Sequence, residues 1–342
     1  MTKRRRSHLS RRMFAKAVAA ISLATLIPKR ASAAEFDYKL ATGQDPTHPN
    51  NLRMQEALNR IREKSGGKLD IKLFPANQLG SDTDLLGQLR NGGIDFQLLS
   101  TSILAVFVPV AGILNTAYAF TDYNVVWNAL DGGLGRYVQS EIEKSRLVSG
   151  FRIWDNGFRQ ITSGTRDIRA PEDLKGFKIR VPLAPMLTSF FSAMGAAPAP
   201  LNFNEVYTSL QTKVIEGQEN PLAIIATAKL YEVQKFCSMS GHSWDGYWPL
   251  ANRRSWDALP ADLRQLVVAE FDKSCTEQRA DVAALNTSLR AVLTKNGMDL
   301  HEVDREAFRA GLAKTSYYRD WKAKYGEGAW SKLEASSGKL AI

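Results

Sequence analysis

Between residues 36 and 99 the chain alternates short strand patterns with short helical patterns, and this order limits the folds open to it. Apolar residues recur at every second position from Phe36 to Leu40 and again from Leu69 to Leu73, which is the period of a β-strand. From Met54 to Ile61 they recur at helical spacing. A strand-helix-strand order of this kind predicts an open, mainly parallel sheet with helices on its faces.

The first α/β unit is completed by one more helix and strand. Ser81 and Asp84 resemble a capping box, in which each residue satisfies a free backbone N–H of the other at a helix start. We therefore expect a short helix that begins there and ends at Gly92. We expect a third strand at Ile94–Leu99.

A second α/β unit of similar character follows. We expect a strand at Phe177–Val181, a helix at Met186–Met194 and another at Asn204–Val214 that is closed by Gly217. Beyond Pro260 the sequence is almost entirely helical in pattern. The sequence thus predicts an α/β protein with two lobes and a helical C-terminal region.

The net charge of +10 belongs to the N-terminal segment. Nine basic residues and no acidic residue occur in residues 1–33, so the rest of the chain is close to neutral. This distribution gives no support to nucleic-acid binding. The segment Ser10–Lys16 reads S-R-R-x-F-x-K, the apolar stretch Ala17–Ile27 is too short to span a bilayer, and Ala31–Ala33 supplies small residues for cleavage.

These features predict a removable export signal over residues 1–33, and the paired arginines resemble the twin-arginine type. An ordinary secretory leader with two chance arginines is the alternative. Either route predicts a periplasmic protein without a membrane anchor, because no other apolar run is long enough to span a bilayer.

The sequence contains no residue pattern typical of a catalytic site or a metal site. Cys237 and Cys275 could form a disulfide or remain two buried thiols, and the sequence leaves both possibilities open. The four histidines show no zinc-binding spacing. Gly241–Asp245 comes close to the nucleophile elbow G-x-S-x-G, but Asp245 occupies the position that requires glycine. We therefore expect no catalytic residues, no metal and no cofactor.

Four segments in the middle of the chain closely resemble one family of transport proteins. They are Asn156–Ser163, Leu174–Pro182, Phe203–Tyr207 and Glu216–Pro221. Together they resemble the solute receptors of tripartite ATP-independent periplasmic (TRAP) transporters, the DctP family. The resemblance implies a two-lobed, type II-like periplasmic-binding-protein fold that captures a small organic anion, performs no chemistry and delivers the ligand to a small and a large membrane subunit.

Under this resemblance we assign lobe I to residues 34–156 and about 246–285, and lobe II to residues 157–245 and about 286–342. The mature protein is expected to be a monomer. A receptor that serves a sensor kinase, or a periplasmic enzyme that acts on a carboxylate, are the alternatives to a transport receptor.

The resemblance also implies which residues bind the ligand. Arg180 would form a two-point salt bridge with the ligand carboxylate, Arg159 would be a second arginine, Asn220 an amide contact and Phe203 a ring against the ligand. The chemistry fits, because a guanidinium presents two parallel N–H donors that match both carboxylate oxygens and lysine cannot reproduce that geometry.

Other positions are less determined by the resemblance. Trp154 and Trp244 could line the cleft or pack in the core. Ser100 and Ile103 stand where receptors for sialic acid have a glutamate and an arginine, which disfavours sialic acid. With Ile103 and several aromatic rings nearby, we expect a small organic acid with one anchored carboxylate and an apolar or aromatic remainder, and a C4 dicarboxylate is the alternative.

Overall fold

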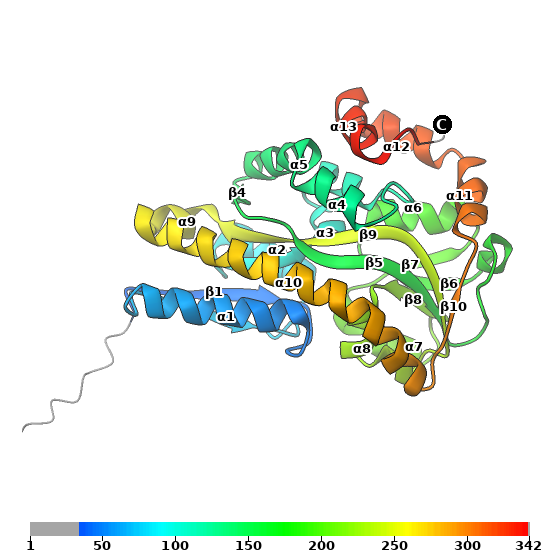
Figure 1. Cartoon of the computed structure of the whole chain (residues 1–342), viewed down its shortest axis with the longest axis horizontal. Helices are drawn as coiled ribbons and strands as arrows, with labels where there is room; N and C mark the ends of the chain where they lie inside the picture. Colours follow the sequence, from blue (N-terminus) through cyan, green and yellow to red (C-terminus); the bar gives the residue numbers. More distant parts are fainter. Residues whose placement is uncertain (1–33, 341–342) are drawn as a thin grey trace, which may run out of the picture. The chain divides into compact units, whose positions relative to one another are not determined.

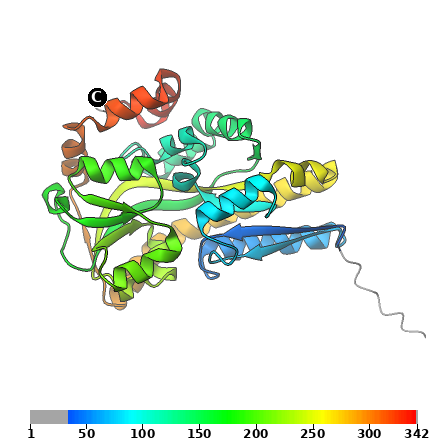
Figure 2. The ribbon, with the colours of Figure 1, turned by 180° about the vertical axis from the view of Figure 1, so that it is seen from behind.

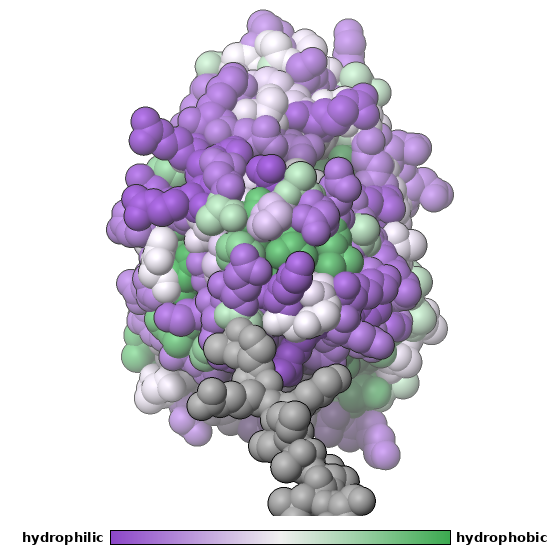
Figure 3. Space-filling model, turned by 90° about the vertical axis from the view of Figure 1, so that its left-hand side faces the viewer, coloured by the Kyte–Doolittle hydropathy of each residue, from purple (hydrophilic) through white to green (hydrophobic). Residues whose placement is uncertain are grey.

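The computed structural model describes residues 34–340 (Figure 1). The predicted export signal, residues 1–33, lies outside the described residues. No helix within residues 34–340 is both long enough and apolar enough to cross a membrane. The face shown in Figure 3 is mostly hydrophilic, with a hydrophobic area near its centre.

Strands and helices alternate along the first two thirds of the chain, and helices dominate the rest. The strands are β1 (Phe36–Thr42), β2 (Leu69–Phe74), β3 (Phe96–Ser100), β4 (Leu147–Val148), β5 (Trp154–Ser163), β6 (Lys178–Val181), β7 (Ala197–Pro200), β8 (Gly217–Asn220), β9 (Phe236–Asn252) and β10 (Asp299–Glu302). The α-helices are α1 (Pro49–Lys64), α2 (Asp82–Asn91), α3 (Thr101–Leu104), α4 (Tyr123–Leu130), α5 (Gly133–Lys144), α6 (Pro185–Ala193), α7 (Val206–Gln211), α8 (Leu222–Thr227), α9 (Arg253–Ala258), α10 (Ala261–Lys295), α11 (Arg305–Ala313), α12 (Tyr317–Tyr325) and α13 (Glu327–Ser337). Short 3₁₀ helices are η1 (Pro109–Asn115), η2 (Pro171–Leu174), η3 (Phe203–Glu205) and η4 (Leu230–Glu232).

The strands form one mixed sheet in the order β2-β1-β3-β9-β5-β8-β6-β7, with β4 and β10 also paired to β9. At one end β1 pairs in parallel with β2 and β3, and at the other β6 pairs in parallel with β7 and β8. In the centre β9 is antiparallel to β3 and β5, and β5 is antiparallel to β8. The expected parallel sheet is therefore found in its outer parts and not in its centre.

The two outer parts of the sheet belong to the two lobes, and three long elements pass between them. β5 and β9 pair along most of their length, and β9 contacts β3 of the first lobe near its end and β10 of the second near its start. Helix α10 packs on α1 in the first lobe and on α8 in the second (Figures 1 and 2). The lobe boundaries assigned from the resemblance stay a prediction.

Several local expectations are confirmed. Ser81 Oγ accepts from the backbone N–H of Asp84, whose carboxylate accepts from the Ser81 N–H, and α2 ends at Gly92 in the left-handed conformation. One expected element differs. The helix predicted over Asn204–Val214 is divided into η3 and the short α7, and Gly217 begins strand β8 instead of closing a helix.

The apolar side chains form three buried clusters. One joins β1, β2 and β3 to α1 and α10, one lies around α7, α8 and the start of β9, and the largest extends from α2 through α6 to α13. Cys237 and Cys275 are both buried and unpaired, and each belongs to a different cluster. The structure thus has two buried thiols and no bridge between them.

Gly217 is required because two parts of the backbone approach closely. A Cβ atom at this position would lie 2.2 Å from the carbonyl oxygen of Thr162 and 2.5 Å from the ring of Phe177. We expect Gly217→Ala to lower the free energy of unfolding by about 1–3 kcal/mol, the usual cost of overpacking a well-filled site. Urea denaturation measures this change.

The control is Gly87→Ala, within helix α2, where nothing lies within 4 Å of the added Cβ. This change should raise stability by about 0.5–1 kcal/mol, because alanine favours a helix over glycine. An equal change in the free energy of unfolding for the two variants would show that the close backbone approach does not require glycine at position 217.

Candidate functional site

Arg180, on β6, carries a buried positive charge that no acidic side chain of the described residues pairs with. Its side chain is 1% exposed, and both its Nε–H and an Nη2–H donate to the carbonyl oxygen of Leu201, at 3.0 and 2.6 Å. Burial lowers the pKa of Arg180 to about 10, so the guanidinium stays charged at neutral pH. A guanidinium has five N–H donors, and its Nη1 edge is left for another acceptor.

Arg159, on β5, is in contrast fully paired by the protein. It donates to both carboxylate oxygens of Glu219, to Asp245 Oδ2 at 3.1 Å and to Asn220 Oδ1 at 3.1 Å. His242 Nε2 lies 3.1 Å from the same Glu219 carboxylate. Burial alone would raise the pKa of Glu219, but the charge of Arg159 and the hydrogen bonds from Arg159 and His242 together outweigh burial, and the pKa falls below its usual value. Arg159 and Glu219 are therefore a buried ion pair.

The backbone around Arg159 is irregular, and this sets the direction of the neighbouring side chains. The register between β5 and β9 shifts between Asp155 and Gly157 and again between Arg159 and Ile161. β-Bulges of this kind redirect side chains and are frequent beside functional sites. Gly157 has a φ of 116°, and a Cβ there would lie 3.3 Å from Pro221. The N-G-F-R and Q-E-N-P segments thus pack directly against each other.

Asp245 gathers donors from elements that are far apart in the sequence. Ser100 Oγ donates to its carboxylate at 2.6 Å, Asn115 Nδ2 at 3.2 Å and Asn156 Nδ2 at 3.1 Å. Asp245 itself is fully buried. Ser100 is thus brought to the same polar network as Arg159, where it contacts a carboxylate of the protein.

Phe203, the first residue of η3, lies beside Arg180. The centroid of its ring is 5.9 Å from the guanidinium carbon, within cation–π range. The ring also lines a cavity of about 310 Å³ together with Gly43 and Asn77 of the first lobe. Phe203 and Arg180 therefore lie where the two lobes face each other.

The two tryptophans pack among apolar side chains. Trp154 is fully buried in the cluster of the first lobe, and its indole N–H has no acceptor in the described residues. Trp244 packs edge-on against Phe120 and Trp127 and donates its N–H to Asp155 Oδ1 at 3.0 Å. Of the two possibilities that the sequence left open, the observed packing favours the core, and ligand contact by these rings stays a prediction.

Asp155 gives a pH-dependent test of this packing. Burial raises its pKa to about 7, even though the Trp244 N–H donates to it and opposes the shift. A carboxyl group whose pKa is raised in the folded state stabilises the protein at low pH and loses that contribution as the pH rises through the folded-state value. Asp155→Asn should therefore increase stability at pH 8 by about 2–4 kcal/mol, as about three pKa units imply.

The gain should shrink as the pH is lowered from 7 towards 4, because the wild-type carboxyl then becomes neutral. Chemical denaturation at several pH values measures the difference between variant and wild type. A difference that does not change with pH would show that Asp155 is not the titrating group.

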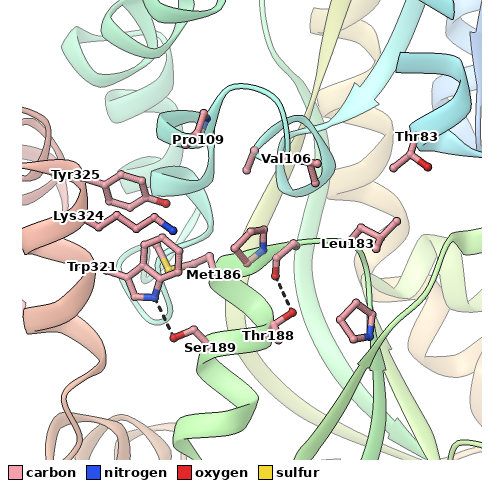
Figure 4. A pocket seen from close by; sticks show the side chains of 14 residues that line it. Thr83, Val106, Pro109, Leu183, Met186, Thr188, Ser189, Trp321, Lys324 and Tyr325 are labelled. Atoms are coloured by element: carbon pink, nitrogen blue, oxygen red, sulfur yellow. Dashed lines mark hydrogen bonds between the residues drawn. The ribbon is translucent and has the colours of Figure 1, made fainter. Parts of the chain in front are cut away.

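A larger cavity of about 740 Å³ lies beside the site and is mostly apolar (Figure 4). It is lined by the start of α2, by the stretch from α3 into η1, by α6 and by α12. Thr83, Leu183 and Pro200 form the side of this cavity that is next to the polar site. It contains neither Arg159 nor Arg180, so it is not where a carboxylate would meet a buried arginine.

Four buried polar residues of the site were not expected from the sequence: Asp82, Gln97, Glu219 and Asp245. Gln97 gave no signal of burial, because it alternates with the apolar Phe96 and Leu98 as a polar residue on the exposed face of a strand would. Glu219 lies within a segment that the resemblance already marked. Asp82 gave no comparable signal, since acidic residues are common in the first turn of a helix.

The comparisons with known proteins agree with this geometry. Residues 40–322 match the family of bacterial extracellular solute-binding proteins, family 7. The chain belongs to this family.

Individual relatives bind different acids. Over 229 residues the chain is 34% identical to the C4-dicarboxylate-binding protein DctB of Bacillus subtilis, a match that covers 67% of this chain and 65% of that protein. Over 301 residues it is 30% identical to the 2,3-diketo-L-gulonate-binding periplasmic protein YiaO of Escherichia coli, which covers 88% and 89% of the two chains. A TRAP periplasmic solute-binding protein from Sulfurospirillum deleyianum with bound succinate superposes with a TM-score of 0.84 at 27% identity and covers 89% of this chain and 99% of that one.

A family 7 solute-binding protein has the two-lobed fold found here. In this member two arginines lie close together between the lobes, one neutralised by the protein and one not. The arrangement can hold one anion against Arg180.

Proposed function

We propose that this protein is the periplasmic receptor of a TRAP transporter and that it captures a small organic carboxylate between its lobes, with Arg180 as the anchor. Asn220 and Phe203 would complete the surroundings of the carboxylate. The captured ligand would be passed to a small and a large membrane subunit, and the receptor would act as a monomer.

One observation carries this proposal. A buried charge without a partner is costly, because removing an ion from water is repaid only by a well-placed opposite charge. Arg180 is buried and stays charged at neutral pH, and within residues 34–340 its guanidinium donates only to the Leu201 carbonyl. A ligand carboxylate at the free Nη1 and Nη2 edge would supply the missing charge and two charge-assisted hydrogen bonds.

Arg159 has a different role in this proposal. Its guanidinium is committed to Glu219 and Asp245. It would support the site by holding Asn220 in place and by adding to the positive potential, while Arg180 makes the main contact with the ligand. The Gly241–Asp245 segment also supports binding without catalysis. A nucleophile elbow lies at a strand-to-helix turn, whereas this segment lies within strand β9.

Arg180→Lys tests the anchor directly. Lysine keeps the charge but loses the two parallel donors, so the carboxylate retains at best one partner. Hydrogen bonds to charged groups contribute roughly 1.5–3 kcal/mol, so the affinity should fall by one to two orders of magnitude or more. Arg180→Ala should weaken binding further. Isothermal titration calorimetry against the best acid from a thermal-shift screen measures both changes.

The matched control is Arg169→Lys on the same lobe, where the arginine is exposed and pairs with Asp167. This variant should bind normally. Near-normal affinity in Arg180→Lys would contradict the proposal, and the carboxylate anchor would then have to be another residue.

A further inference from the structure

Asp82 places a buried carboxyl group in the first lobe, at the start of helix α2. Its side chain is 5% exposed. A Cβ added to Gly43 would lie 2.4 Å from Asp82 Oδ1 and 3.1 Å from Asn77 Oδ1, so both side chains point to the space beside Gly43. Gly43 and Asn77 line the cavity that Phe203 of the second lobe closes from the other side.

Asp82 and Arg180 lie near this cavity on opposite lobes, Asp82 beside Gly43 and Arg180 beside Phe203. Thr83, the next residue, donates to Asn202 Oδ1 at 3.4 Å across the lobes, and Asn202 follows the Leu201 carbonyl that holds Arg180. Burial raises the pKa of Asp82 to about 6, and the charge of Arg180 acts in the opposite direction. The two side chains form no ion pair with each other, although each affects the charge of the other.

Several amide side chains of the first lobe near Asp82 have buried atoms without hydrogen-bond partners in the described residues. Gln97 is 1% exposed and donates to the backbone oxygen of Asp82 at 3.2 Å, while its Oε1 has no donor in the described residues. The Asn77 amide lies beside the Asp82 carboxylate, while the buried Oδ1 of Asn77 and Oε1 of Gln44 are without partners in the described residues. Buried polar atoms are normally hydrogen-bonded, so these groups require a ligand or water.

We infer that the ligand is a monocarboxylate whose carbon chain carries hydroxyl groups, and that Asp82 excludes a second carboxylate from the site. This inference rests on the proposed function, since it assumes that Arg180 holds the first carboxylate. Hydroxyl groups donate as well as accept, so they can satisfy the oxygens of Asp82, Gln97 and Asn77.

A ligand with a second carboxylate or with an apolar chain fits these polar groups less well. A second carboxylate would meet the negative charge of Asp82, and Arg180 is already committed to the first. An apolar chain, which the sequence favoured through Ile103, would leave the amides of Gln97 and Asn77 unpaired on closure, and unpaired buried polar groups are costly. Ile103 itself is buried in the apolar cluster next to the site.

The experiment compares three four-carbon acids by calorimetric titration of the purified mature protein at pH 7.5: 2,3,4-trihydroxybutanoate, succinate and butanoate. Gluconate, adipate and hexanoate repeat the comparison at six carbons, so that ligand length is not confused with ligand polarity. We expect the hydroxylated acid to bind at least tenfold more tightly than the other two at one or both lengths.

Asp82→Asn then tests the carboxyl group itself. The ratio of succinate affinity to trihydroxybutanoate affinity, or the equivalent six-carbon ratio, should rise at least tenfold, because the amide no longer repels a second carboxylate. Asp37→Asn, an exposed position on β1 of the same lobe, is the matched control and should leave the ratio unchanged.

The outcomes distinguish failure of this inference from failure of the proposed function. A wild-type protein that prefers the dicarboxylate or the apolar acid at both lengths overturns this inference, while the proposed function survives if Arg180→Lys weakens that binding. An unchanged ratio in Asp82→Asn overturns the role of Asp82. Failure of all six acids to bind, while another carboxylate from the thermal-shift screen binds in an Arg180-dependent way, overturns the inference and leaves the proposed function standing.

Discussion

The contact between the Arg180 guanidinium and the Leu201 carbonyl organises the rest of the site. Parallel pairing of β6 with β7 sets Arg180 beside Ala199, and the Leu201 N–H donates to the Val181 carbonyl at 3.1 Å. The chain therefore returns past the arginine at a fixed distance and presents one carbonyl oxygen to it. This holds one edge of the guanidinium in place and leaves the other edge for an anion that the protein does not supply.

The charge of the neighbouring Arg159, in contrast, is neutralised by carboxylates of the protein. Its charge is shared between Glu219 on β8 and Asp245 on β9, and Asp245 also accepts from Ser100 at the end of β3. One network of buried charges thus joins the central strands to the first lobe. Two carboxylates face the single guanidinium of Arg159, and the charge of Glu219 also acts on Arg180 from a distance. No acidic side chain of the described residues pairs directly with Arg180, which explains why the two arginines differ in role.

The sequence predicted the outer parts of the fold well because their signals are local. The capping pair Ser81 and Asp84 and the alternation in β1 and β2 depend on neighbours within a few residues. The centre of the sheet could not be predicted in this way. The antiparallel pairing of β9 with β3 and β5 joins residues 73 to 155 positions apart, and no local pattern encodes it.

The same distinction applies to the site. Arg180, Arg159 and Asn220 were identified because their segments resemble those of a known family. Their different pairing was not predictable, since it depends on whether Glu219 reaches one arginine or the other across the sheet. The surroundings of Asp82 were missed for a similar reason, because only the packing of the two lobes brings this helix start near Arg180.

The central claim is that a ligand carboxylate supplies the counterion of Arg180, and a crystal structure of the protein with its tightest-binding acid tests it most directly. The account predicts both carboxylate oxygens within hydrogen-bond distance of Arg180 Nη1 and Nη2, with Leu201 still accepting at the opposite edge. A carboxylate bound elsewhere, or an Arg180 paired with an acidic side chain of the protein while ligand is bound, would contradict it.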